Sequence, residues 1–184
     1  MRLDINQRKI SYGAKYDIFN EGEKEYFAKS EIFTFLAVIY LTKSGESIPC
    51  VIIKKKWSWF RANYEIEIER NKTIKFITKS LWKPHYQCVY GTDIYDIYSH
   101  RGRKKSIFKN NVQIAWLNKE AVSWFEGDNY KIIHNQDCNK ELIIAFCLII
   151  DNYMSRNDDG ATLTYDFGNL GGEMKKFDSN WIPN

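Results

Sequence analysis

The longest apolar run of the chain extends from Leu142 to Ile150, nine residues without a polar side chain. It is too short to span a bilayer, which takes about 20 apolar residues, and it has no polar face to turn toward solvent. The pattern therefore predicts a segment that is buried on every side. Asp137 or Asn139 would provide an N-cap, and we predict a helix over about residues 140–154. The four isoleucines of the run keep a strand open as the alternative.

Short β-strands are predicted for most of the chain before this run. Apolar and polar positions alternate there, and turn residues such as Gly, Asn and Ser separate the alternating segments. The predicted strands are 15–19, 25–29, 33–42, 48–56, 64–69, 73–79, 86–90, 94–99, 106–109, 112–119 and 130–134. Short turns between such strands are typical of antiparallel hairpins. We therefore expect a meander of hairpins to enclose the apolar run.

Two short patterns recur in the same order within the predicted strands. Residues 16–19 (YDIF) recur as 95–98 (YDIY), and the Trp-Phe, Asn-Tyr and Ile of 59–66 recur in 124–132. An exposed strand edge is a liability, which closure of a sheet removes. The repetition therefore indicates two related β-halves that close around one core.

Composition is consistent with one globular domain. The chain has 184 residues, of which 44% are hydrophobic and 16% aromatic, enough for a single core. The formal net charge of +4 is a mild basic excess, so a nucleic-acid partner is not expected. We place the domain at residues 1–154 and a C-terminal extension at 155–184, with one edge strand at 161–167.

The N-terminus and the cysteines indicate a location inside the cell. Residues 1–6 lack the apolar stretch of a secretion signal, and no segment is long enough to be a transmembrane span. Cys50, Cys88, Cys138 and Cys147 form no CxxC motif or zinc-ligand spacing, so we predict free thiols and no metal. A cytoplasmic protein, at most peripheral at the membrane, is expected.

Several segments together resemble a known family. They are residues 56–60 (KWSWF), 64–66 (YEI), 121–125 (AVSWF) before Tyr130, and 141–151 (ELIIAFCLIID). Over about residues 8–154 the chain resembles the LURP-one-related family of the tubby C-terminal-like superfamily, which includes the phospholipid scramblases. The resemblance implies a mainly β fold, a closed antiparallel barrel of about twelve strands with a buried hydrophobic helix at its centre.

The resemblance implies less about activity. Tubby domains bind phosphoinositide head groups and scramblases are lipid-associated, but the basic residues of the tubby site have no match here. The calcium segment and the cysteine-rich acylation segment of scramblases also have no counterpart. Residues 157–160 (NDDG) lack the ligand spacing of an EF-hand loop and are interpreted as a turn.

No catalytic motif is present, so an enzyme is not expected. His85, His100 and His134 are isolated in the sequence, and there is no HExxH, GxSxG or GxxxxGK segment. Asp93 and Asp96 are three residues apart at the start of a strand, which directs them to opposite faces. We interpret both as surface carboxylates, and we expect no cofactor.

Two basic clusters remain as candidate sites for an anionic ligand. The first is Lys54, Lys55 and Lys56, beside two tryptophans, and the second is Arg101, Arg103, Lys104 and Lys105 on a hairpin tip. Lys and Arg attract anionic head groups and Trp prefers the edge of a bilayer, so the clusters favour peripheral contact with anionic lipids. The competing interpretation is a solvated surface on a protein-interaction or structural module without a small ligand. If the two clusters lie close together at one end of the barrel, the lipid-binding interpretation is favoured.

Overall fold

A computed structural model of the chain describes all residues except 11–12, 34–35, 59–60, 69–71, 121–127 and 159–172. In this part of the chain there are twelve strands, one 3-10 turn and one α-helix. The elements are β1 (Arg2–Ile10), β2 (Gly13–Asn20), β3 (Glu23–Phe33), β4 (Leu36–Lys43), β5 (Val51–Lys55), β6 (Asn63–Ile68), β7 (Lys72–Ser80), β8 (His85–Tyr90), β9 (Asp93–Ser99), η1 (Arg101–Arg103), β10 (Lys104–Lys109), β11 (Val112–Glu120), β12 (Asn129–His134) and α1 (Lys140–Asp158).

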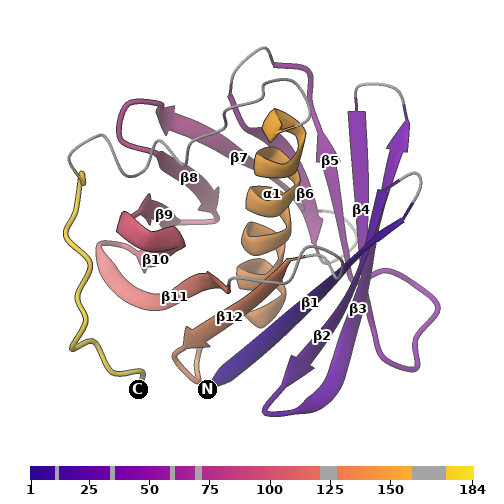
Figure 1. The fold of residues 1–184 in the computed structure, drawn as a ribbon, viewed down its shortest axis with the longest axis horizontal. Helices are drawn as coiled ribbons and strands as arrows, with labels where there is room; N and C mark the ends of the chain where they lie inside the picture. The colour runs from indigo at the N-terminus through magenta and orange to yellow at the C-terminus, as the bar shows by residue number, and fades with distance from the viewer. Residues whose placement is uncertain (11–12, 34–35, 59–60, 69–71, 121–127, 159–172) are drawn as a thin grey trace.

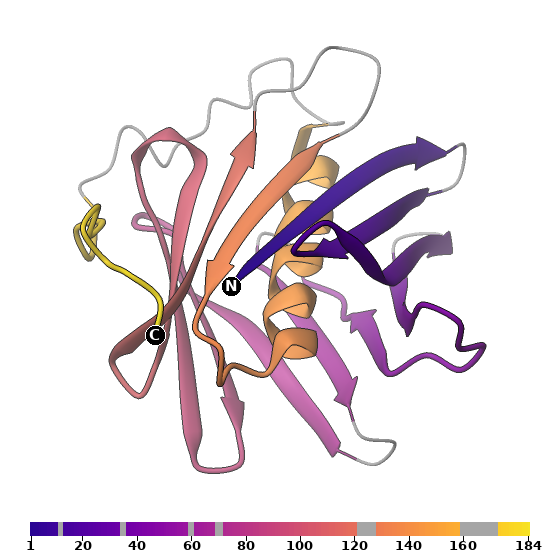
Figure 2. The ribbon, with the colours of Figure 1, turned by 90° about the horizontal axis from the view of Figure 1, so that it is seen from below.

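The strands form a closed antiparallel barrel, which confirms the predicted fold class. Each strand pairs with its neighbours in sequence, and β1 pairs with β12 to close the ring (Figures 1 and 2). The register of the closure places Arg2 opposite Ile133, and the terminal amine of Met1 donates to the carbonyl of His134 at 2.9 Å. Along β2 and β6 buried residues alternate with more exposed ones, as expected when one face of a sheet lines the core.

Helix α1 runs through the barrel, and every side chain from Leu142 to Ile150 is buried (Figure 1). Strands on several sides contact it. The ring of Phe146 lies 5.6 Å from that of Phe76 on β7 and 5.7 Å from that of Tyr95 on β9. Asn139 is the N-cap, because its side-chain oxygen accepts the backbone N–H of Leu142 at 2.9 Å. The predicted central helix is therefore confirmed, with four more residues at its C-terminal end.

Strand β1 was not among the strands predicted from the sequence. Its inward-facing positions include Leu3 and Ile5, but the next one is Gln7, which interrupts the apolar alternation. The Gln7 amide donates to a buried carboxylate of α1, Asp151, at 2.8 Å. A polar residue thus takes an inward position because the helix presents a polar group there, and this partner cannot be inferred from the strand alone.

The alternating strand directions give the barrel two rims. Strand β3 begins, and β4 ends, beside the start of α1, where Lys140 pairs with Glu25 at 2.5 Å and Glu141 pairs with Lys43 at 3.3 Å. We call this the helix-start rim. The opposite rim, near the end of α1, carries the connections β5–β6 (56–62), β7–β8 (81–84) and β9–β10 (100–103). We call it the helix-end rim.

Of the C-terminal extension, residues 155–158 continue α1, and residues 173–184 run along the outside of the barrel beside β10 and β11 (Figure 1). Phe177 contacts the rings of His100 and Trp116, at centroid distances of 5.3 and 6.0 Å. The last residue, Asn184, hydrogen-bonds through its backbone to Asn135 and Gln136. The edge strand predicted at 161–167 lies outside the described residues.

Candidate functional site

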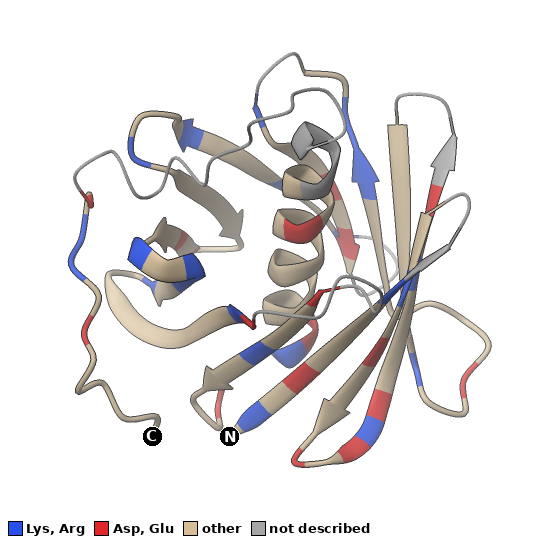
Figure 3. Cartoon of the chain, viewed as in Figure 1, with Lys and Arg blue, Asp and Glu red and all other residues tan. Residues whose placement is uncertain are grey.

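The helix-end rim brings both predicted basic clusters into one arc. Going round the barrel from β5 to β10, the connections 56–62, 81–84 and 100–103 follow one another. The first cluster ends β5 and the second begins with η1, so the β7–β8 turn lies between them. Figure 3 shows Lys and Arg at the ends of β5 and β7 and on η1.

Acidic residues are missing from the sequence of this arc. Residues 54–62, 79–84 and 100–105 together contain ten Lys and Arg and no Asp or Glu. More broadly, residues 51–120 contain 15 Lys and Arg against six Asp and Glu, although the whole chain has an excess of only four. The positive charge of the protein is thus concentrated on one half of the barrel, and most sharply along this arc.

The first cluster is partly neutralised by the neighbouring strand. Lys54 pairs with Glu67 at 2.5 Å and Lys56 pairs with Glu65 at 2.8 Å, both across the β5–β6 ladder. Lys55 is half-buried at the rim. These pairs are partly exposed, and such pairs contribute only about 0–1 kcal/mol, so an anionic ligand can compete for the ammonium groups.

The members of the second cluster lie in three different environments. Arg101 and Arg103 are exposed on η1, where Gly102 (φ 73°) and Arg103 (φ 67°) adopt left-handed conformations that turn the chain tightly. Lys104 lies over the ring of Phe177, with its Nζ atom 4.8 Å from the centroid. Lys105 is only 5% exposed, because its side chain points into the barrel on the same face as Ile107. Arg101 and Arg103 are therefore the residues of this cluster most open to a ligand.

Further cations of the arc had not been singled out from the sequence. Arg61, Lys79 and Lys83 are exposed, and within the described residues no ion pair involves them. Their positions are set by the scaffold, because Ala62 donates its N–H to Thr78 Oγ1 at 2.8 Å and accepts from the Thr78 N–H at 2.9 Å. These bonds tie the β5–β6 connection to β7. Lys79 and Lys83 could have been found from the lysine spacing along 72–83, a stretch without acidic residues.

Large apolar side chains on the same arc face solvent. Trp82 is 91% exposed, Trp57 67% and Leu81 47%. Trp57 and Trp59 have the same strand parity, which is compatible with both pointing into the core, but the structure places Trp57 outside it. Trp59 lies outside the described residues.

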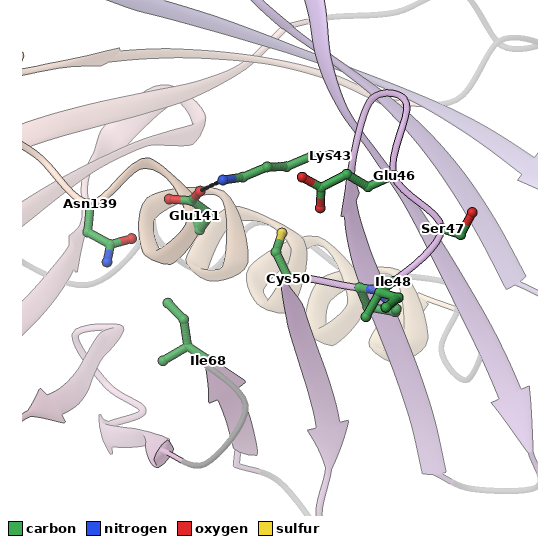
Figure 4. Close-up of a pocket in the computed structure, with 9 residues that line it drawn as sticks. Lys43, Glu46, Ser47, Ile48, Cys50, Ile68, Asn139 and Glu141 are labelled. Carbon is green, nitrogen blue, oxygen red and sulfur yellow. Dashed lines mark ion pairs between the residues drawn. The ribbon is translucent and has the colours of Figure 1, made fainter.

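The helix-start rim has a pocket of about 750 Å³. Figure 4 shows its lining, with the carboxylate of Glu141 facing the ammonium of Lys43. Glu141 also accepts a hydrogen bond from the Tyr26 hydroxyl at 3.0 Å. The thiol of Cys50 is half-buried beside the pocket, and burial raises its pKa. A thiol with a raised pKa is a poor nucleophile at neutral pH, so the described lining offers polar groups for binding, and Cys50 is not activated there.

A second polar group lies inside the barrel near the end of α1. The carboxylate of Asp151 accepts hydrogen bonds from Tyr16 at 2.7 Å, from Tyr130 at 2.5 Å and from the Gln7 amide at 2.8 Å. Burial raises the pKa of Asp151, and the hydrogen bonds from the two tyrosines oppose that change. Burial also raises the pKa of both tyrosines well above 10. The cluster is closed to solvent, so we interpret it as structural.

The repeated sequence pattern has a structural counterpart at this point. Tyr64 on β6 and Tyr130 on β12 are equivalent in the repeat, and these strands are six positions apart in the twelve-strand ring. Tyr64 donates to Asn152 at 2.9 Å and Tyr130 donates to Asp151, the preceding helix residue. Two equivalent tyrosines thus hold consecutive residues of α1 from opposite walls.

The histidines and carboxylates considered for catalysis do not converge. His85 Nε2 lies 2.7 Å from Asp96 Oδ1, a pairing across β8 and β9 that the sequence spacing did not predict. His100 and His134 are buried, and burial lowers the pKa of both. Among the described residues, no group of three or more His, Cys, Asp or Glu side chains is placed to hold a metal ion, and the four cysteines are free.

Comparison with other proteins identifies no relative. No protein-family model, no curated protein and no solved structure matches the chain. The described part of the chain also has no helix with the length and hydropathy of a membrane span. The helix-end rim therefore stands as the candidate site on its own geometry.

Proposed function

We propose that this protein is a non-catalytic binding module whose helix-end rim binds the head groups of anionic lipids. The observation that carries the proposal is the set of exposed cations on three consecutive connections of one rim, namely Arg61, Lys79, Lys83, Arg101 and Arg103. The connections themselves contain no Asp or Glu, and in the described part of the chain the carboxylate that reaches them, Glu173 of the C-terminal extension, accepts the backbone N–H of Arg101 at 2.9 Å. Each Lys or Arg near an anionic surface contributes about 1 kcal/mol. Several cations on one rim can meet a surface together, whereas the same charges spread over the barrel could not.

The resemblance to the LURP-one-related family supports the same proposal. The twelve-stranded barrel around a hydrophobic helix is the fold that this resemblance implies. We propose that the chain is a divergent member of that family and that its location is cytoplasmic, peripheral at a membrane. The absence of a catalytic motif from the sequence supports a binding role over an enzymatic one.

Sedimentation with liposomes tests the proposal. The protein should sediment with vesicles that contain phosphatidylserine or phosphoinositides, but not with neutral phosphatidylcholine vesicles, and salt should weaken the binding. Replacing Arg101→Ser and Arg103→Ser should reduce the fraction bound. The control Lys24→Ser with Lys29→Ser removes the same charge from β3, on the far side of the barrel.

Two results would count against the proposal. If the wild-type protein ignores anionic vesicles at low salt, the rim is a solvated surface and the protein-interaction module is the better interpretation. If both double variants lose binding equally, net charge explains the contact and the rim has no special role.

A further inference from the structure

Three exposed large apolar side chains, Trp57, Leu81 and Trp82, lie on two adjacent connections of the helix-end rim. Others, such as Leu36, Ile48 and Val112, are exposed elsewhere on the two rims. Most of the large side chains in this protein are enclosed, and Tyr16, Tyr64 and Phe76 are at most 2% exposed. In contrast, Trp82 leaves almost its whole surface in water. Exposed apolar area is unfavourable by about 25 cal/mol per Å² relative to burial. Single exposed apolar residues are common, but several on adjacent connections mark an interaction surface.

The scaffold presents these side chains on an anchored projection. The β7–β8 turn, residues 81–84, is fixed to the next strand by the hydrogen bond from Ser99 N–H to the Pro84 carbonyl at 3.0 Å. Its other side is joined through Thr78 to Ala62 in the connection that carries Trp57. Leu81 and Trp82 therefore stand at a tip, with Trp57 on the neighbouring connection of the same rim.

Cations surround this apolar tip. Lys79 and Lys83 flank it along the chain and Arg61 lies on the adjoining connection, all of them exposed. Trp is preferred at the interface between head groups and acyl chains, and Lys and Arg extend from there to the phosphates. The cations match the negative head groups of an anionic bilayer, and the apolar side chains match the region just below those head groups. An isolated phosphate or a free head group offers nothing to Leu81 and Trp82.

We propose that Trp57, Leu81 and Trp82 form an interfacial anchor that enters an anionic bilayer, with Arg61, Lys79 and Lys83 on its head groups. This inference rests on the proposed function and specifies its ligand as a membrane surface. Single-stranded nucleic acid also combines cations with stacked aromatics, but it binds along grooves. Residues 81–84 form a projecting turn, and an aliphatic side chain beside the tryptophan adds little to base stacking.

The test uses the full chain and vesicles of phosphatidylcholine with and without phosphatidylserine. Replacing Leu81→Ser and Trp82→Ser should lower the partition coefficient on anionic vesicles by about tenfold, the effect of losing roughly 1.4 kcal/mol of apolar transfer. Lys79→Ser with Lys83→Ser should lower it as well and should weaken its salt dependence. The matched control is Val112→Ser at the helix-start rim, which removes a side chain of comparable exposure and should bind as wild type.

Insertion has a direct optical readout. Lipids brominated near the head group should quench the tryptophan fluorescence of the wild-type protein, and the quenching should fall in Trp57→Phe with Trp82→Phe. Circular dichroism should show the same fold for all variants, because every changed side chain faces solvent.

The outcomes separate the anchor from the proposed function. If the wild-type protein sediments with anionic vesicles but the Leu81/Trp82 variant binds equally and no quenching occurs, the anchor is refuted while head-group binding stands. If the wild-type protein fails to sediment with anionic vesicles, both fail. Binding to a single-stranded oligothymidine in preference to anionic vesicles would also overturn the anchor.

Discussion

Two carboxylates of α1, Glu141 in its first turn and Asp151 in its second half, have different surroundings in the barrel. Glu141 at the start is partly exposed and pairs with the Lys43 ammonium and the Tyr26 hydroxyl. Asp151, ten residues later, is 1% exposed and accepts three hydrogen bonds from neutral donors. At Glu141, where water has access, the ammonium of Lys43 balances the charge of the carboxylate. Where water is excluded, fixed hydroxyl and amide donors replace it.

Because of this difference, the residues that stabilise the fold at the helix-end rim are not the residues that would bind a ligand there. The polar groups that hold the second half of α1 are enclosed in the barrel. They therefore do not pair with the cations outside, which stay available to an anionic ligand. At the helix-start rim the same residues, Lys43 and Glu141, both hold the helix and line the pocket. A ligand there would have to disturb a stabilising contact, whereas a ligand at the helix-end rim would not.

The largest effect is expected at the buried carboxylate. Asp151→Ala should lower the free energy of unfolding by about 3–5 kcal/mol, because it leaves two tyrosine hydroxyls and an amide buried without their acceptor. Urea unfolding followed by circular dichroism measures the change. A loss below about 1 kcal/mol would mean that the network contributes little to the fold.

The equivalent change at the partly exposed carboxylate should be much smaller. Glu141→Ala should lower the free energy of unfolding by about 1 kcal/mol, since partly exposed ion pairs and a helix N-terminal charge each contribute a few tenths. The same urea experiment compares the two variants. Equal losses for Glu141 and Asp151 would contradict the distinction between the two carboxylates.

The pH dependence should sharpen the comparison. The pKa of Asp151 is raised in the folded state, so folding favours its protonated form. Its contribution to stability is therefore complete below its usual pKa of about 3.9. That contribution is lost as pH rises through the raised pKa, by about 1.4 kcal/mol for each pH unit that separates the folded and unfolded pKa values. The stability advantage of wild type over Asp151→Ala should therefore shrink as the pH is raised above about 4. A difference that stays constant with pH would show that the carboxylate titrates alike in folded and unfolded chains.

The smallest effect on stability is expected outside the barrel. Arg101→Ser with Arg103→Ser should change the free energy of unfolding by no more than about 0.5 kcal/mol, because both side chains are exposed on η1. Thermal melting should show almost no change in melting temperature for this double variant and a large decrease for Asp151→Ala, although both changes lie near the same rim. A large loss in the double variant would mean that the cations hold the rim together and are not free to bind.

The sequence predicted the architecture because burial leaves a strong periodic signal. Leu142–Ile150 has no polar face and needs an enclosing sheet, and the strand pattern supplies one. Strand β1 was not predicted because Gln7, at an inward-facing position, is polar. The partner of Gln7 is Asp151 on α1, far away in the sequence. Local periodicity carries no information about such a partner.

The candidate site was predicted less completely. Lys105 shares its strand face with Ile107, so extending the predicted strand back by one residue would have placed it inside. The pairing of Lys54 with Glu67 depends on the β5–β6 register, which the sequence alone does not determine. The turn at residues 81–84 could have been recognised, since a proline and two large apolar residues between strands predict an exposed apolar tip.

The position of α1 in the chain has a consequence for how the protein is made. The core helix follows all twelve strands in the sequence, and the closing pair of strands joins Arg2 to Ile133. During synthesis the inward-facing side chains of the strands therefore leave the ribosome before the helix that they must pack around. Contacts this distant in sequence form slowly, and exposed strands without a core are prone to aggregate. We expect the nascent chain to depend on chaperones until residue 158 has left the ribosome. The barrel core should form only after that point, because α1 is part of it.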